Sequence, residues 1–84
     1  MKKFKRVEKL DFGTAIREFR LAAGLSQDDL VDRADMHKSY LSMLENRKRQ
    51  PSPEMLVRIA RALNIPPGDL LNRAAESYPD PDPE

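Results

Sequence analysis

The residues with the most distinctive chemistry lie between positions 37 and 52, in the segment HKSYLSMLENRKRQPS. At about 100° per residue, a helix over this segment would separate two sets of side chains. The set suited to a hydrophobic core consists of His37, Tyr40, Leu41 and Leu44. The opposite set is mostly small, forms hydrogen bonds and carries no acid; it consists of Lys38, Ser39, Ser42, Met43 and Asn46.

This second set offers the chemistry that reads base edges in a DNA groove. A lysine ammonium can donate to guanine O6 and N7, a serine hydroxyl can serve either kind of partner, and an apolar side chain can contact a thymine methyl. Three cations, Arg47, Lys48 and Arg49, follow directly and could lie beside phosphates. The pattern is equally typical of an ordinary amphipathic surface helix, so its interpretation depends on the rest of the chain.

Two residues of this segment have alternative roles. Met43 could contact thymine methyls or pack on the rim of the core, and the sequence favours neither role. Tyr40 is better explained as a core residue whose hydroxyl reaches the surface than as a base reader.

The size and composition of the chain indicate one small intracellular domain. With 84 residues, it can bury only about 60% of its unfolded surface. It has no cysteine for disulfides or thiolate metal sites. No apolar run has the length of a signal peptide or approaches the roughly 20 residues that span a bilayer. We therefore expect a soluble, cytoplasmic protein without membrane contact.

The net charge of +1 conceals a strong asymmetry. Residues 1–9 contain five cations and one acid, a local charge of +4, and we assign 1–10 as a basic N-terminal arm. Residues 76–84 carry four acids, so subtracting −4 from the total leaves +5 on the rest of the chain. Because alternating Pro and Asp neither bury apolar area nor form a helix, we expect 76–84 to be a disordered acidic tail.

Capping residues and periodicity predict the first two helices. Asp11 can cap a helix that the left-handed residue Gly24 ends. Ser26 and Asp29 form an S-x-x-D capping pattern for a short second helix, which ends near Ala34. The predicted inward residues are Phe12, Ala15, Ile16, Phe19 and Ala23 in the first helix, and Leu30, Val31 and Ala34 in the second.

Three more helices follow within a predicted domain at 11–75. The third covers about 37–46. The fourth is capped by Ser52, starts at Pro53 and ends near Asn64, with Leu56, Ile59, Ala60 and Leu63 facing inward. A connection over 65–68 leads to a last helix from Asp69 to about Ala75. No segment has the alternating pattern of a strand, so the expected fold class is all-α.

The second and third helices are joined by a turn of three or four residues, and the third is polar on its free face. This is the helix-turn-helix arrangement, in which the later helix can enter a major groove about 12 Å wide.

Three segments resemble a known family: GLSQDDL at 24–30, KSYLSMLENRKRQPS at 38–52 and LVRIARALNI at 56–65. From about residue 11 to 72, the chain resembles Cro/C1-type helix-turn-helix regulators, also called the xenobiotic response element family. The KSYLS and EN elements are most similar to the biofilm repressor of bacilli and to restriction-modification controller proteins. The resemblance implies a five-helix, lambda-repressor-like DNA-binding domain, bacterial or phage-encoded.

The resemblance also implies roles for individual residues. The base-contacting positions are Lys38, Ser39, Ser42 and Met43. The phosphate-contacting positions are Gln27, His37, Asn46, Lys48 and Arg49, and Gln27 would also brace the recognition helix. Arg20 and Glu45 match a buried salt bridge between the first and third helices. Both residues fall at the margins of apolar stripes, where a paired charge is tolerable and an unpaired one is costly.

Three positions depart from the family pattern. Asp35 and Arg47 stand where turn glycines are usual. Because Asp tolerates the left-handed conformation and Arg does not, we expect Asn46 to adopt it in place of Arg47. His37 is a poor helix cap compared with Ser or Thr.

Catalysis and metal binding have little support in the sequence. A single histidine, no cysteine and no glycine-rich loop leave no recognisable active site, so we expect no enzyme and no cofactor. Asp28, Asp29 and Asp32 do not have calcium-loop spacing and are better explained as complementing a helix dipole.

The resulting hypothesis is a transcriptional regulator, a repressor or autoregulator, that binds double-stranded DNA. A homodimer on a palindromic operator is expected because one recognition helix reads too few base pairs. By resemblance, its interface would use Ile65, Leu70 and Leu71, and a protein antagonist or co-regulator is a further possible partner. The main alternative is a helical protein-binding module, such as an antitoxin. RNA binding is weakened by the lack of interleaved aromatics for base stacking.

Overall fold

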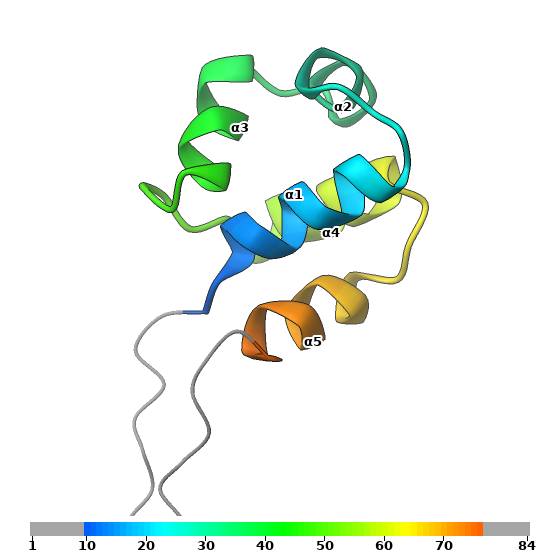
Figure 1. Cartoon of the computed structure of the whole chain (residues 1–84). Coiled ribbons are helices and arrows are strands. Elements are labelled where there is room, and N and C mark those ends of the chain that lie inside the picture. Colours follow the sequence, from blue (N-terminus) through cyan, green and yellow to red (C-terminus); the bar gives the residue numbers. More distant parts are fainter. Residues whose placement is uncertain (1–9, 77–84) are drawn as a thin grey trace, which may run out of the picture.

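The computed structural model describes residues 10–76, which form five helices and no strand (Figure 1). The helices are α1 (Phe12–Ala22), α2 (Gln27–Ala34), α3 (Lys38–Glu45), α4 (Pro53–Ala62) and α5 (Pro67–Glu76). The predicted all-α, five-helix fold is therefore confirmed. Residues 1–9 of the predicted arm and 77–84 of the predicted tail lie outside the described residues, whereas Glu76, assigned to the tail, is the last residue of α5.

The helices surround one hydrophobic core, with α2 and α3 at one end of the molecule and α5 at the other (Figure 1). α1 packs against both α3 and α5, while α4 packs against α2 and α5. The largest fully buried side chains come from all five helices: Ile16, Leu30, Leu41, Leu44, Ile59 and Leu70. The helix-turn-helix pair α2–α3 is thus held by the core.

The predicted caps form the starts of three helices. Asp11 Oδ1 accepts a hydrogen bond from Thr14 N at 3.1 Å. Ser26 and Asp29 make a reciprocal capping box, with distances of 3.0 and 2.9 Å. Ser52 caps α4, whose first residue is Pro53. These bonds satisfy backbone donors that a helix N-terminus otherwise leaves without partners.

Three boundary and core predictions need correction. α5 begins at Pro67 rather than Asp69, because proline lacks an N–H and has a helical φ, which suit a first helical position. Ala23 is exposed because it is the C-cap residue of α1 rather than part of its inner face. His37 is exposed as well, because it precedes the first turn of α3.

The left-handed residue after α3 also differs from the prediction. Asn46 has φ −91°, whereas Arg47 has φ +63°. The Arg47 N–H donates to Leu44 O at 3.1 Å, and the Lys48 N–H donates to Met43 O at 2.8 Å. These two bonds form a Schellman motif, which requires the left-handed conformation at the residue after the C-cap. Asp35 does adopt it, with φ +55°.

Candidate nucleic-acid interface

The outer face of α3 carries the residues expected to contact bases. Lys38 and Ser39 are exposed in the first turn, and Ser42 and Met43 are half-buried one turn later. Met43 is not among the partly buried hydrophobic side chains that pack against the buried cluster, whereas Tyr40 is. Asn46 donates from Nδ2 to Ser42 Oγ at 3.3 Å. This face therefore presents an ammonium, hydroxyls and one apolar side chain together.

Lys38 has an acidic neighbour that sequence reasoning missed. Its Nζ lies 3.2 Å from Asp28 Oδ1 in the first turn of α2. Both side chains are largely exposed, at 57% and 74%, so water screens the pair and its contribution to stability is small. The pair can open to let Lys38 bind another acceptor.

The basic loop after α3 divides its three cations among different surroundings. Arg47 turns back to α1 and bonds to Asp11 and Thr14. The Arg49 guanidinium lies 5.8 Å from the centroid of the Tyr40 ring, within the range of a cation–π contact. Lys48 is exposed at the loop surface. Arg47 is thus engaged by α1, whereas Arg49 lies against Tyr40 and Lys48 is exposed.

A buried ion pair positions α3 against α1. Arg20 donates from Nε to Glu45 Oε2 at 2.7 Å and from Nη2 to Oε1 at 3.0 Å. Its Nη1 donates to Leu25 O at 2.9 Å, and Gln27 Nε2 donates to Glu45 Oε1 at 3.1 Å. The bond to Glu45 raises the pKa of Arg20 above its ordinary value despite the burial. This network braces the recognition helix from α1 and α2 together, and Gln27 is the expected brace.

A glycine allows the same two helices to approach closely. A Cβ on Gly13 would lie 2.6 Å from Leu44 O and 3.0 Å from Glu45 O. Because both neighbours are backbone atoms of α3, the absence of a side chain at position 13 sets how close α1 and α3 can be. Sequence reasoning overlooked Gly13, since periodicity assigns it no role.

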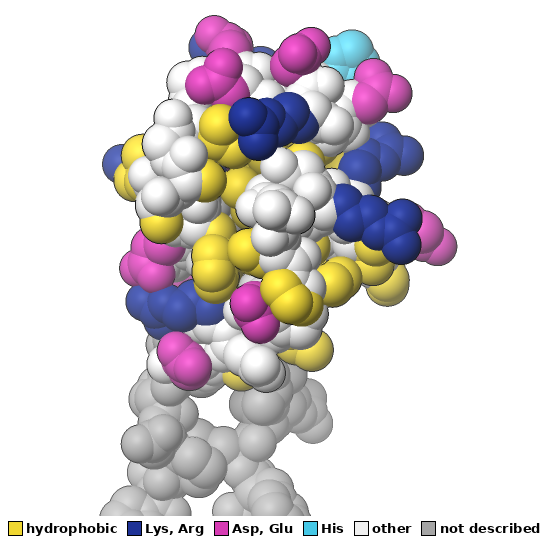
Figure 2. Space-filling view, turned by 90° about the vertical axis from the view of Figure 1, so that its right-hand side faces the viewer, with side chains coloured by type: hydrophobic (Ala, Val, Ile, Leu, Met, Phe, Trp, Pro, Cys, Tyr) yellow, Lys and Arg dark blue, Asp and Glu magenta, His cyan; other side chains and the backbone are white. Residues whose placement is uncertain are grey.

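The expected dimer residues occupy different environments. Leu70 is fully buried in the core of the single chain, so it cannot form part of a contact surface. Ile65 is half-buried, and Leu71 is 44% exposed. Leu21 at the end of α1, not among the expected residues, is 56% exposed. Hydrophobic side chains gather on the face where α1 ends and the α4–α5 connection lies (Figure 2).

Other site types find no support in the part of the chain that the structure describes. Between residues 10 and 76, no group of three His, Cys, Asp or Glu side chains could hold a metal ion. None of the five described helices combines the length and the apolar character needed to cross a membrane.

The capping carboxylate Asp11 makes stability sensitive to acid. Burial opposes its charge, but hydrogen bonds from Arg47 and Thr14 outweigh this effect and hold the pKa of Asp11 below its usual 3.8. A lowered pKa stabilises the fold above the unfolded value, and this stabilisation is lost as pH falls through the folded value.

We therefore expect the free energy of unfolding to drop below about pH 4, and Asp11→Asn to reduce that drop. Asparagine keeps the cap but does not titrate. Urea denaturation of both proteins between about pH 5 and 2 measures the effect. Parallel profiles for the two proteins would contradict it.

The comparisons with known proteins agree with this geometry. A helix-turn-helix family model matches residues 16–70. Control protein C.BamHI from Bacillus amyloliquefaciens is 35% identical over 65 residues, covering 76% of this chain and 80% of that protein. The structure of the restriction-modification controller protein C.AhdI from Aeromonas hydrophila matches with a TM-score of 0.69 at 36% identity, over 73% of this chain and 92% of that one. The biofilm master regulator SinR in complex with DNA matches with a TM-score of 0.68 at 31% identity, over 71% and 97%.

Proposed function

Because this chain belongs to the Cro/C1-type helix-turn-helix family of DNA-binding transcription regulators, we propose that it acts as a repressor or autoregulator that binds a palindromic operator as a homodimer. The observation that carries the proposal is the outer face of α3, which lacks acids and presents Lys38, Ser39, Ser42 and Met43. The SinR structure contains DNA, which supports the same ligand here.

In the proposed complex, α3 lies in the major groove. Lys38 exchanges its contact with Asp28 for guanine O6 and N7, and the serines donate to or accept from base edges. Met43 contacts a thymine methyl. Phosphates are bound by Gln27, His37, Asn46, Lys48 and Arg49, of which Gln27 also holds Glu45. These phosphate contacts set the register of the protein on the duplex and carry no sequence information themselves.

The proposed dimer uses the exposed apolar face described above. We propose that the interface includes the half-buried Ile65 and the exposed Leu71 and Leu21. Covering such side chains on association removes apolar area from water. Sedimentation at tens of micromolar tests this proposal, and a monomer both free and on DNA would contradict it.

The decisive experiment is selection from random duplex DNA at about physiological salt, where non-specific phosphate binding is weak. We expect enrichment of an inverted repeat whose half-site centres lie about one helical turn apart. A folded protein that enriches no motif would overturn the proposal and favour the protein-binding module, for which the apolar face would be the contact surface.

Replacing Lys38 by alanine should weaken binding to the selected operator by about 1–2 kcal/mol and relax the preference for guanine at one position per half-site. The reason is that the ammonium is the strongest hydrogen-bond donor at the start of α3. Titration of the operator and of single-base variants measures both effects.

Asp28→Ala serves as the control, since it opens the same ion pair but leaves the ammonium in place. A uniform loss of affinity across all base variants with Lys38→Ala would indicate a phosphate contact instead.

A further inference from the structure

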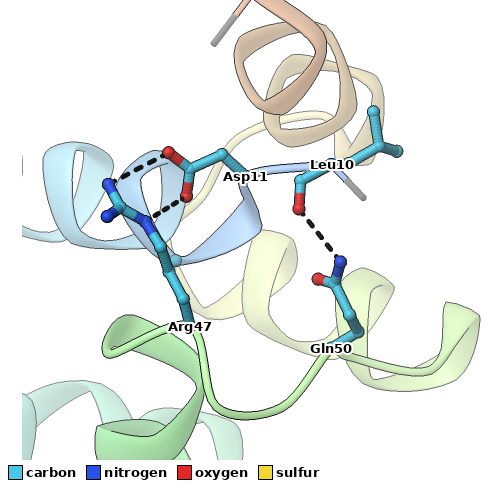
Figure 3. Close-up of a pocket in the computed structure, with 5 residues that line it drawn as sticks. Leu10, Asp11, Arg47 and Gln50 are labelled. Carbon is cyan, nitrogen blue, oxygen red and sulfur yellow. Dashed lines mark hydrogen bonds and ion pairs between the residues drawn. The ribbon is translucent and has the colours of Figure 1, made fainter. Parts of the chain in front are cut away.

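The loop after α3 is tied to the start of α1 by two contacts (Figure 3). Arg47 donates from Nε and Nη2 to the two Asp11 carboxylate oxygens at 2.9 and 3.1 Å, and Nη2 also donates to Thr14 Oγ1. Gln50 Nε2 donates to Leu10 O at 3.0 Å. These contacts join residues that lie 33 to 40 positions apart in the chain.

The four residues of these contacts, hereafter the joint, are Leu10, Asp11, Arg47 and Gln50. Together with Gly13 they line a pocket of about 370 Å³. In Figure 3 the Arg47 guanidinium points to the Asp11 carboxylate, and the Gln50 amide points to the Leu10 carbonyl. Arg47 and Asp11 neutralise each other, and Gln50 is bonded to a backbone carbonyl. The arrangement therefore connects two segments and does not prepare a site for a small ligand.

The backbone of Arg47 makes the contact costly to build. Its φ of +63° lies in the left-handed region, which is unfavourable for a residue with a Cβ and costs glycine almost nothing. The unfavourable backbone conformation of Arg47 is offset by the two-pronged bond from its guanidinium to Asp11. Lysine cannot reproduce the geometry of this bond. The side chain is 62% exposed and yet directed back at α1 instead of into solvent.

Because of the place of Arg47 in the chain, its contact with Asp11 affects the loop that carries Lys48 and Arg49. It directly follows the C-cap of α3 and directly precedes Lys48 and Arg49. Fixing its side chain on α1 limits how the loop can swing away from the recognition helix. Leu10, held by Gln50, is also the residue at which the described chain continues from the basic segment 1–9.

We propose that Arg47 is a positioning residue: its contact with Asp11 holds the 47–50 loop so that Lys48 and Arg49 reach DNA phosphates, while Arg47 itself makes no DNA contact. This proposal rests on the proposed DNA-binding function. If Arg47 contacted a phosphate directly, releasing it from Asp11 would strengthen operator binding. If Arg47 positions the loop, releasing it weakens operator binding, and the following variants separate these two outcomes.

Asp11→Asn is the informative substitution. Asparagine caps a helix about as well as aspartate, so α1 keeps its start. Removing one negative charge should by itself strengthen binding to a polyanion. The substitution also releases Arg47, which would strengthen binding further if that side chain contacted phosphate. We expect operator affinity to fall roughly fivefold instead. This factor corresponds to the upper range of the free energy that an exposed ion pair contributes. Unchanged or tighter binding would overturn the positioning role.

Arg47→Gly provides the second variant. Glycine removes the backbone strain, so the fold is retained, but it also removes the contact with Asp11. Operator affinity should fall by a similar factor, and the double variant with Asp11→Asn should lose no more than either single variant. Additive losses would mean that the two residues act separately and would contradict the proposal.

Glu18→Gln is a matched control. It breaks another two-pronged arginine pair, in which Arg73 donates to Glu18 at 2.7 and 2.9 Å between α5 and α1, and it also removes one negative charge. Operator affinity should be unchanged or slightly higher. A fivefold loss here would show that any change at the surface of α1 weakens binding, and would overturn the assignment to Arg47.

Amide hydrogen exchange in the absence of DNA tests the joint independently of the proposed function. The Lys48 N–H, bonded to Met43 O, should exchange about five times faster in Asp11→Asn than in the unaltered protein, a larger acceleration than for core amides such as that of Ile16. If no operator is selected but Lys48 exchange accelerates, the proposed function fails and the joint stands. Unchanged Lys48 exchange overturns the joint whether or not DNA binds.

Discussion

Replacing Glu45 by alanine is expected to lower the free energy of unfolding by about 3–5 kcal/mol, because it leaves the buried guanidinium of Arg20 without its counter-charge. The two side chains are only 9% and 5% exposed, so water cannot replace the lost partner. Gln27 loses its bond to the same carboxylate, and α3 loses its brace to α1 and α2. Urea denaturation followed by circular dichroism measures the loss.

The Arg73–Glu18 pair provides a control of nearly identical geometry. Its shortest distance is also 2.7 Å, but its side chains are 34% and 49% exposed. Glu18→Ala should therefore cost no more than about 1 kcal/mol. Similar losses for the two variants would contradict the argument from burial. Replacing Arg20 and Glu45 together by methionine should restore much of the stability, since no charge then remains buried.

The sequence predicts the helices well because their signals are local. Asp11, Ser26 and Ser52 lie within three residues of the amides they cap, and the apolar residues of each helix recur within two turns. Nearest-neighbour chemistry therefore suffices to locate α1 to α4. It fails at the start of α5, where Pro67 is compatible with both a connection and a first helical position.

The candidate site could be predicted only in part because its geometry depends on distant contacts. Periodicity alone places Lys38, Ser39 and Ser42 on the free face of α3. It does not show that Arg47 accepts a positive φ, since that conformation is compensated by Asp11, 36 residues earlier. Nor does periodicity show that Leu70 is fully buried in the core, because its burial depends on how α5 packs on α1 and α4.

Gly13 allows the close approach of α1 and α3, a role that the sequence pattern does not show. Replacing it by alanine should destabilise the fold by about 2–3 kcal/mol, because the new Cβ would lie 2.6 Å from Leu44 O and 3.0 Å from Glu45 O. Both obstacles are backbone oxygens in the last turn of α3, which cannot rotate away as a side chain would. The strain can be relieved only by separating α1 from α3, which also disturbs the ion pair at Glu45.

Gly68→Ala is the matched control for Gly13→Ala. A Cβ at Gly68 in α5 would meet open space, and the higher helix propensity of alanine should raise stability by up to about 1 kcal/mol. Denaturation curves for the two variants should thus move in opposite directions. Equal or increased stability for Gly13→Ala would mean that α1 and α3 do not approach as closely in solution. Since that approach sets the direction in which α3 projects, Gly13→Ala should also weaken operator binding, whereas Gly68→Ala should leave it unchanged.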